Sequence, residues 1–320
     1  MQIPFLLSTA SLLTRAVAGS CAPTFEGRIP PNATSALFSS AESPFNPKYV
    51  LGKNISWDQV ISFPDVQPSI LDAVAQTKPI EIKITDASIF SSSSEGPETA
   101  LRRAELLVNN RPSTVSGTKT WFLSLRTSPA RPLNYTHEYL LAFHEAADYQ
   151  ADFWSLKTGV PMTGSYGEII GFRNASVEGG VQNWMGEGRV LYLQGYKWAS
   201  PVQTFFLTPF YPDTWHNFGI YLDFNSNHLQ VLYSTDNNPL HLVTPLLPNN
   251  LSGKAPTTLG ETHFGIQKKP VGANLTNFLY EGEQELGVRE GLLMGGISQI
   301  EGFPMGCNFS FVQIRSKAID

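Results

Sequence analysis

The sequence predicts an all-β protein, an antiparallel β-sandwich of the jelly-roll type with few short helices. Many short runs are rich in aromatic and β-branched residues, and Gly, Pro, Asn and Ser separate them. Helical periodicity is sparse, being clearest at residues 70–76. The chain shows no internal repeat and no linker dense enough to divide it. We therefore expect residues 19–320 to form a single domain.

Residues 80–85 show the clearest strand pattern. Ile80, Ile82 and Ile84 alternate with polar residues, so one face of this strand should be buried. Residues 159–190 are rich in Gly, Pro and Asn and are expected to form long loops. The other expected strands are residues 25–28 at an edge, 101–108, 120–126, 153–157, 190–193, 202–207, 215–224, 229–234, 263–267, 291–297 and 308–314, with 57–63 as a short strand or turn.

The N-terminus is typical of a secretory signal peptide at residues 1–18. A short apolar run from Ile3 to Leu13 precedes Ala16-Val17-Ala18, a small-x-small cleavage pattern. The two cysteines, Cys21 and Cys307, would pair as a disulfide in an oxidising compartment. Seven Asn-x-Ser/Thr sequons agree with a secreted, extracellular glycoprotein, at Asn32, Asn54, Asn134, Asn174, Asn250, Asn274 and Asn308.

Composition favours a neutral ligand such as a polysaccharide. Only 15% of the residues are charged, and the formal net charge is −5. Nucleic-acid binding would need a basic surface. The apolar run of the signal sequence is too short to span a membrane, and no other segment approaches that length. Dinucleotide, phosphate-loop and nucleophilic-serine motifs are missing as well. We expect a monomer with no cofactor and no metal.

Titratable groups gather in residues 131–153, among aromatic and aliphatic side chains. If this stretch is a strand without a bulge, positions 138, 140, 142 and 144 share one face, and the odd-numbered positions share the other. Glu138 and His144 could then line one cleft. A helix remains an alternative for residues 145–153, where alanines are frequent.

Paired carboxylates are the chemistry that the residues allow best, because glycoside hydrolysis needs one acid and one base or nucleophile. Glu105, near Arg103, could stay ionised as a base. Burial near Tyr139 could raise the pKa of Glu138 and make it an acid. From the pattern alone, an ordinary salt bridge or a solvated strand position is the favoured interpretation of each. His216 could contact a sugar or be a core histidine. Arg103, His144, Gln267 and Lys268 are candidate substrate contacts.

Several blocks, taken together, resemble the fungal glycoside hydrolase family 131 β-glucanases. They are Cys-Ala-Pro-Thr-Phe-Glu-Gly-Arg at 21–28, Leu-Arg-Arg-Ala-Glu-Leu at 101–106, Arg-Pro-Leu-Asn-Tyr-Thr-His-Glu-Tyr at 131–139, Trp-His-Asn-Phe at 215–218 with Leu-Asp-Phe at 222–224, and His-Phe-Gly-Ile-Gln-Lys-Lys-Pro at 263–270 leading to Glu-Gly-Leu-Leu-Met-Gly-Gly at 290–296. Their order and rough spacing agree with the family. Residues 159–200 have no counterpart that we can place, and we expect them to reshape the cleft.

The resemblance implies a jelly roll with an open cleft on its concave face, and a hydrolase acting on β-1,3-, β-1,6- and β-1,4-glucans. It implies Glu105, Glu138 and His216 as catalytic residues, with the two glutamates as acid and base in either order and with inversion at the anomeric carbon. Glu145 and His144 are second choices for the second catalytic group. The alternative is a non-catalytic β-glucan lectin on the same fold, which needs no pair of carboxylates.

Overall fold

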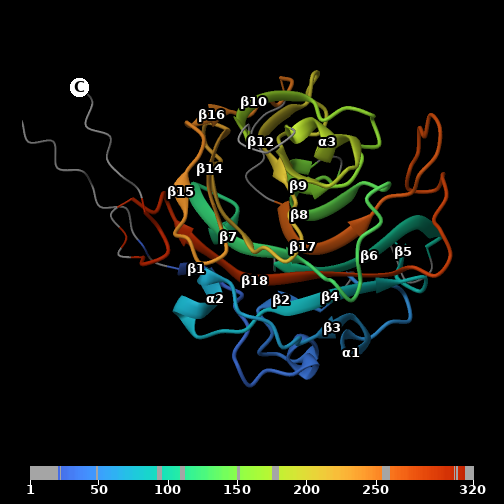
Figure 1. Cartoon of the computed structure of the whole chain (residues 1–320), viewed down its shortest axis with the longest axis horizontal. Helices are drawn as coiled ribbons and strands as arrows, with labels where there is room; N and C mark the ends of the chain where they lie inside the picture. Colours follow the sequence, from blue (N-terminus) through green and yellow to red (C-terminus); the bar gives the residue numbers. More distant parts are fainter. Residues whose placement is uncertain are drawn as a thin grey trace, which may run out of the picture.

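The computed structural model describes residue 21 and residues 23–47, 50–91, 96–108, 112–149, 152–174, 180–253, 260–305, 307 and 309–313. These residues form two large β-sheets and three short α-helices, as Figure 1 shows. The β7 sheet has the order β15-β14-β13-β7-β18-β4-β3, and the β17 sheet has the order β10-β12-β11-β9-β8-β17-β6-β2. Three more short strands, β1, β5 and β16, lie off these paths. The predicted all-β, jelly-roll class is confirmed.

The β7 sheet contains β15 (His241–Leu242), β14 (His228–Thr235), β13 (His216–Asp223), β7 (Thr118–Thr127), β18 (Arg289–Glu301), β4 (Ile80–Thr85) and β3 (Ile61–Ser62), with β1 (Pro23–Glu26) on β18 and β16 (Leu247–Pro248) on β14. The β17 sheet contains β10 (Glu168–Arg173), β12 (Gln203–Pro209), β11 (Val190–Gln194), β9 (Asp152–Thr158), β8 (Tyr139–Ala146), β17 (Gly260–Lys268), β6 (Glu98–Val108) and β2 (Phe45–Asn46), with β5 (Ile89–Ser91) on β6.

Aromatic and aliphatic side chains from the facing sides of the two sheets form the main core. Trp121 of β7 meets Phe264 of β17 edge to face, with ring centroids 5.2 Å apart. Phe218 of β13 meets Phe206 of β12 in the same way at 5.3 Å. Because each strand alternates its side chains, the next residues of the β17 sheet point away from this core. That outer face of the β17 sheet carries the polar residues described below.

Of the predicted helices, one is confirmed and one is wrong. Helix α2 (Ile70–Ala75) begins after Ser69, whose hydroxyl accepts the Asp72 N–H at 3.1 Å. Residues 145–153 are not a helix, because residues 145–146 complete β8 and β9 begins at Asp152. Helix α1 spans Trp57–Val60, and two 3₁₀ turns span Ser35–Ser39 and Pro112–Thr114. The described part of the expected last strand makes an isolated bridge between Leu240 and Val312.

Residues 159–190 contain regular structure where the sequence predicts loops. Strand β10 pairs in parallel with β12, and helix α3 (Val181–Gly186) packs on the same strand. Val181, Tyr192 and Leu207 form a separate hydrophobic cluster on the outer face of β11 and β12. The segment therefore covers one end of that outer face, where Figure 1 shows α3 beside β12. This burial of apolar surface explains why a stretch rich in turn residues is ordered.

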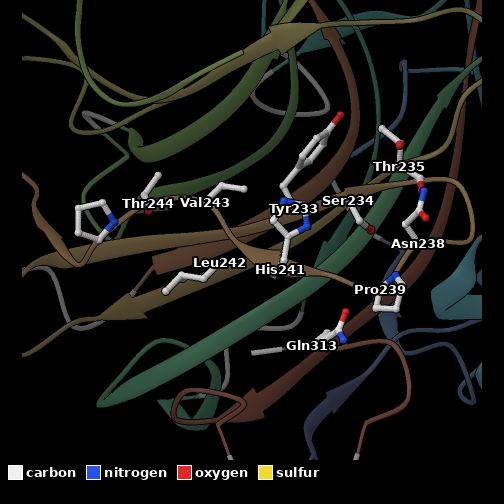
Figure 2. A pocket seen from close by; sticks show the side chains of 11 residues that line it. Tyr233, Ser234, Thr235, Asn238, Pro239, His241, Leu242, Val243, Thr244 and Gln313 are labelled. Atoms are coloured by element: carbon white, nitrogen blue, oxygen red, sulfur yellow. The ribbon is translucent and has the colours of Figure 1, made fainter. Parts of the chain in front are cut away.

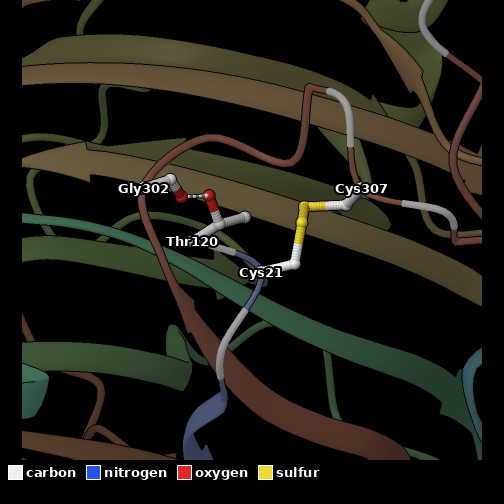
Figure 3. Close-up of a disulfide and its surroundings, with 4 residues drawn as sticks. All are labelled: Cys21, Thr120, Gly302 and Cys307. Carbon is white, nitrogen blue, oxygen red and sulfur yellow. Dashed lines mark hydrogen bonds between the residues drawn. A yellow bond between two sulfur atoms is a disulfide. The ribbon is translucent and has the colours of Figure 1, made fainter. Parts of the chain in front are cut away.

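The disulfide prediction is confirmed. Cys21 and Cys307 are bonded, with Cα atoms 5.7 Å apart, and their bond closes a loop with a sequence separation of 286 residues. Figure 3 shows it beside Thr120, whose hydroxyl donates to the Gly302 carbonyl at 2.6 Å. The pair joins the residues just before β1 to the segment after β18.

The predicted signal peptide and one sequon, Asn308, lie outside the described residues. Four sequon asparagines are exposed, at positions 32, 54, 250 and 274. Asn134 and Asn174 are half-buried, and their amide groups donate to Glu285 and Thr208. Among the described residues, no helix is long and apolar enough to cross a membrane.

Candidate active site

Glu105 lies on the outer face of β6 and is held by three neighbours. Its Oε2 accepts the His263 Nδ1–H at 2.9 Å and lies 3.4 Å from Arg103 Nε. Its Oε1 accepts a longer hydrogen bond of 3.3 Å from Gln267 Nε2. Burial would raise the pKa of Glu105, but Arg103 and His263 together hold that pKa below its ordinary value. Glu105 is therefore ionised, as the sequence predicts.

A glycine in β17 lets two side chains reach Glu105. Gly265 pairs with Glu105 across the strands, between His263 and Gln267, where the pairing with β8 is interrupted. Its φ is +151°, and a Cβ there would lie 2.3 Å from the backbone oxygen of Ala104. Only glycine fits this close approach without displacing β6.

A bulge in β8 decides which carboxylate joins Glu105. Leu140 pairs with Lys157 and Ala142 pairs with Leu156, so one extra residue of β8 lies between these two pairs. The alternation is thereby reversed, and Phe143 and Glu145 lie on the outer face with Glu138. His144 turns instead to the core. The uninterrupted alternation, which would group Glu138 with His144, is therefore wrong.

Glu145 faces the same imidazole as Glu105, from the other side. Its Oε2 lies 4.0 Å from His263 Nε2, and its side chain is 27% exposed. Burial raises the pKa of Glu145 to about 7; the His263 charge opposes this shift and Asp152 adds to it. Glu145 therefore keeps a proton at mildly acidic pH, as a general acid must.

His263 joins these carboxylates and is a residue that the sequence reasoning missed. It stacks on Phe143, with ring centroids 4.5 Å apart, and Glu261 Oε2 lies 3.7 Å from its Nε2. Burial would lower the pKa of His263, but Glu105 and Glu261 raise it to about 9. The ring is therefore an imidazolium at neutral pH. The sequence held one indication of this role: His263 lies four residues before Gln267 on β17, an even spacing that places both side chains on one face of the strand.

Glu138 lies on the same outer face but does not fit the predicted role of acid. Its carboxylate pairs with Lys269 at 2.5 Å and Lys157 at 3.4 Å, and it accepts the Met162 N–H at 2.8 Å. Burial would raise the pKa of Glu138, as the sequence suggests, but the two lysines outweigh burial and lower it far below its ordinary value. Glu138 is therefore ionised at neutral and mildly acidic pH.

His216 and His144 lie in the interior rather than at the carboxylates. His216, on β13 of the other sheet, shares a 2.7 Å hydrogen bond between its Nδ1 and the Tyr233 hydroxyl. His144 bonds Thr262 Oγ1 at 3.0 Å. Both are fully buried, and burial lowers the pKa of each to about 3. The catalytic role expected for His216 does not fit this position, which is that of a core histidine. Nor does substrate contact fit His144.

The remaining predicted substrate contacts divide into two groups. Arg103 and Gln267 contact Glu105 on the outer face, as described above. Lys268 points elsewhere, because its Nζ pairs with Glu290 at 2.6 Å and with Glu285. A buried ion cluster of this kind leaves Lys268 no access to substrate.

A metal ion is not required by the donor atoms at this site. Glu145, Glu261 and His263 each bring one potential ligand atom within 4.8 Å of the others. With no ion at these atoms, the carboxylates around His263 favour its protonated form, and the three groups then share protons.

Two cavities lie away from the Glu105–Glu145 pair. One of about 830 Å³ is on the β7 sheet, around Tyr233, His241 and Thr244; Figure 2 shows its lining. The other, of about 190 Å³, lies beside Glu138 between Met162 and Pro270. Neither is lined by Glu105, Glu145 or His263, so the chemistry and not cavity size identifies the candidate site.

A β-sandwich with carboxylates of different pKa on the outer face of one sheet is compatible with the class of glycoside hydrolases, whose chemistry needs two such groups. The chain belongs to glycoside hydrolase family 131. The family model described as the glycoside hydrolase 131 catalytic N-terminal domain matches residues 24–302.

Solved structures agree in fold. The catalytic domain of a GH131 β-glucanase from Podospora anserina superposes with a TM-score of 0.61 at 16% identity, over 88% of this chain and 97% of the other. That of a glycoside hydrolase family 131 protein from Coprinopsis cinerea gives 0.58 at 17% identity, over 88% and 94%. A sequence comparison with curated proteins gives no match.

Proposed function

We propose that this protein is a secreted β-glucan hydrolase in which Glu145 is the general acid and Glu105 the general base. The observation that carries this assignment is the arrangement around His263, where one carboxylate is held ionised and the other keeps its proton. Glycoside hydrolysis needs this division of protonation states. Glu145 thus takes the place that the sequence reasoning gave first to Glu138.

The reaction follows from these two states. Glu145 gives its proton to the glycosidic oxygen as the bond from that oxygen to the anomeric carbon breaks. Glu105 takes a proton from the water that attacks the same carbon. We assign this proton to its Oε1, which accepts the longer bond of 3.3 Å from Gln267, because His263 and Arg103 hold Oε2. One water is consumed, and exchange with solvent restores both carboxyl groups.

The position of the imidazole supports inversion at the anomeric carbon. Glu105 and Glu145 approach opposite nitrogens of His263, so a whole ring lies between them. Inverting enzymes hold their carboxyl groups roughly 6.5–9.5 Å apart, which leaves room for a water, and retaining enzymes hold them about 5 Å apart. Because the His263 ring stands between the two carboxylates, we assign this site to the inverting class.

The substrate class and the location rest on further observations. The Podospora relative is described as a β-glucanase, and we extend β-1,3-, β-1,6- and β-1,4-glucan cleavage to this chain. Trp198 is 57% exposed on the loop after β11, where the neighbouring Lys197 N–H donates to the Asp152 carbonyl. Its indole face suits stacking on a sugar ring. The Cys21–Cys307 disulfide supports secretion, because such bonds persist in oxidising compartments.

Release of reducing sugar tests the proposal. Purified mature protein is incubated with a β-1,3/1,6-glucan and with a soluble β-1,4-glucan, alongside Glu145→Gln, Glu105→Gln and the exposed control Glu168→Gln. We expect the first two variants to lose about a hundredfold or more in kcat while keeping the wild-type circular dichroism, and the control to match wild type. Binding without cleavage by the wild type would instead support the lectin alternative. Full activity of Glu145→Gln would refute the assignment of the acid.

A further inference from the structure

His263 has one unpaired donor and two carboxylates competing for it. Its Nδ1–H is taken by Glu105, whereas its Nε2 is buried without a hydrogen-bond partner among the described residues. Glu261 Oε2 lies 3.7 Å from this nitrogen and Glu145 Oε2 lies 4.0 Å from it. A buried, charged N–H without an acceptor is unfavourable, so a small side-chain rotation that brings one carboxylate to it is favoured.

Charge balance indicates that the two competitors cannot both be ionised without cost. The groups that face Glu145 come from β17, β6, β9 and the turn after β8, and they are His263, Glu261, Glu105, Arg103, Asp152 and Tyr149. Two of them are cations, and three are carboxylates in addition to Glu145 itself. Like charges at this spacing favour a proton on one carboxyl. Of Glu145 and Glu261, the carboxyl that does not accept the Nε2–H is the one that keeps its own proton.

We propose that Glu261 is a positioning residue that takes the Nε2–H of the His263 imidazolium and so leaves Glu145 with its own proton for the leaving group. Glu261 lies directly opposite Glu145 in the pairing of β17 with β8, and its carboxylate is the nearer of the two to Nε2. The inference rests on the proposed function for its catalytic consequence, but the contact with His263 does not depend on activity.

The test is Glu261→Gln, measured in two independent ways. The first readout is the titration of the His263 ring by NMR, with its signal assigned by the loss of that signal in a His263→Gln variant. Removal of the second carboxylate should lower the pKa of His263 by roughly one unit. This readout reports on the contact even if the protein cleaves no glucan.

The second readout is the pH profile of kcat/KM on β-glucan. Without Glu261, Glu145 becomes the acceptor of Nε2–H, which stabilises its ionised form. The alkaline limb of the profile should therefore move down by roughly one pH unit, with kcat at low pH nearly unchanged. Glu261→Asp should restore the limb at least in part, and the exposed control Glu168→Gln should leave it in place.

Two results would overturn the inference. If His263 titrates alike in Glu261→Gln and wild type, the contact does not hold the imidazolium. If kcat instead falls about a thousandfold at every pH and added azide restores turnover, Glu261 is itself the base or nucleophile. Glu145→Gln tests the proposed acid separately, because this variant should lose the alkaline limb of the pH profile. Failure of the proposed function is therefore distinguishable from failure of this inference.

Discussion

Replacing Glu145 by glutamine is expected to make the protein less active and, at the same time, more stable in a pH-dependent way. The substitution keeps the shape of the side chain and removes its ionisation. In wild type the folded state resists that ionisation, because burial and nearby Asp152 raise the pKa of Glu145 from 4.5 to about 7. A carboxyl that must ionise in such a place destabilises the fold.

The sign and size of the effect follow from linkage between protonation and folding. A raised pKa contributes stability below the unfolded value of 4.5, and this contribution is lost as pH rises towards and through 7. The full difference between the two pKa values corresponds to about 3 kcal/mol. Glu145 is 27% exposed, so solvent screens part of it, and we expect about 2 kcal/mol between pH 5 and pH 8.

Urea denaturation of both proteins at about pH 5 and pH 8 measures this difference directly. The gain in unfolding free energy of Glu145→Gln over wild type should be small at the lower pH and larger by about 2 kcal/mol at the higher one. Glu168→Gln, an exposed control, should show no such growth. A gain that is equal at the two pH values would refute the raised pKa of Glu145, and with it the reason for assigning it as the acid.

Three further outcomes are expected. Glu138→Gln leaves Lys157 and Lys269 without their counter-charge and should lower the unfolding free energy by about 3–5 kcal/mol in urea denaturation near neutral pH. The loss should shrink as pH falls below 4.5, and the alkaline limb of kcat/KM should stay at its wild-type pH. A shifted limb would contradict a purely structural Glu138. His216→Phe should retain kcat, and its unfolding free energy should fall less than that of wild type on acidification. The reason is that a histidine with a pKa lowered to about 3 destabilises the fold as pH falls below 6.5. Loss of kcat in folded protein would restore a catalytic role. Cys21→Ala with Cys307→Ala should lower the unfolding free energy by about 5 kcal/mol relative to disulfide-bonded wild type, measured by denaturation without reductant. An unchanged value would show that closing this loop contributes little.

The sequence was a good guide to strands and a poorer guide to the faces of one strand. Alternation in residues 80–85 and 215–224 predicts β4 and most of β13, because each has one apolar face. In β8 both faces carry apolar residues and titratable groups, so no pattern marks the bulge between Leu140 and Ala142. Because of that single extra residue, Glu145 lies on the same face as Glu105 and His144 lies in the core. Register of this kind depends on the partner strand, which the sequence of β8 does not contain.

Residues 159–190 show a second limit of sequence patterns. Turn residues dominate them, yet Val181 and Ile169 pack with Tyr192 on the outer face of β11. The burial that orders this segment comes from residues of another strand, so local propensity predicts loops. The result for function is a wall of α3 and β10 at one end of the face that carries the carboxylates.

The contrast between Glu138 and Glu145 shows what makes a catalytic acid on this fold. The two lie seven positions apart, on the same face of the same strand region. Burial acts to raise the pKa of both, although the net pKa of Glu138 is lowered. Burial therefore cannot distinguish them. Glu138 meets two ammonium groups, whereas Glu145 shares a single imidazolium with two other carboxylates. The number of cations around each carboxylate decides whether that carboxyl group keeps its proton. Those cations lie on β9 and on or just after β17, distant in the sequence. A search for catalytic acids in related sandwiches should therefore count counter-charges across strands before it ranks carboxylates by burial.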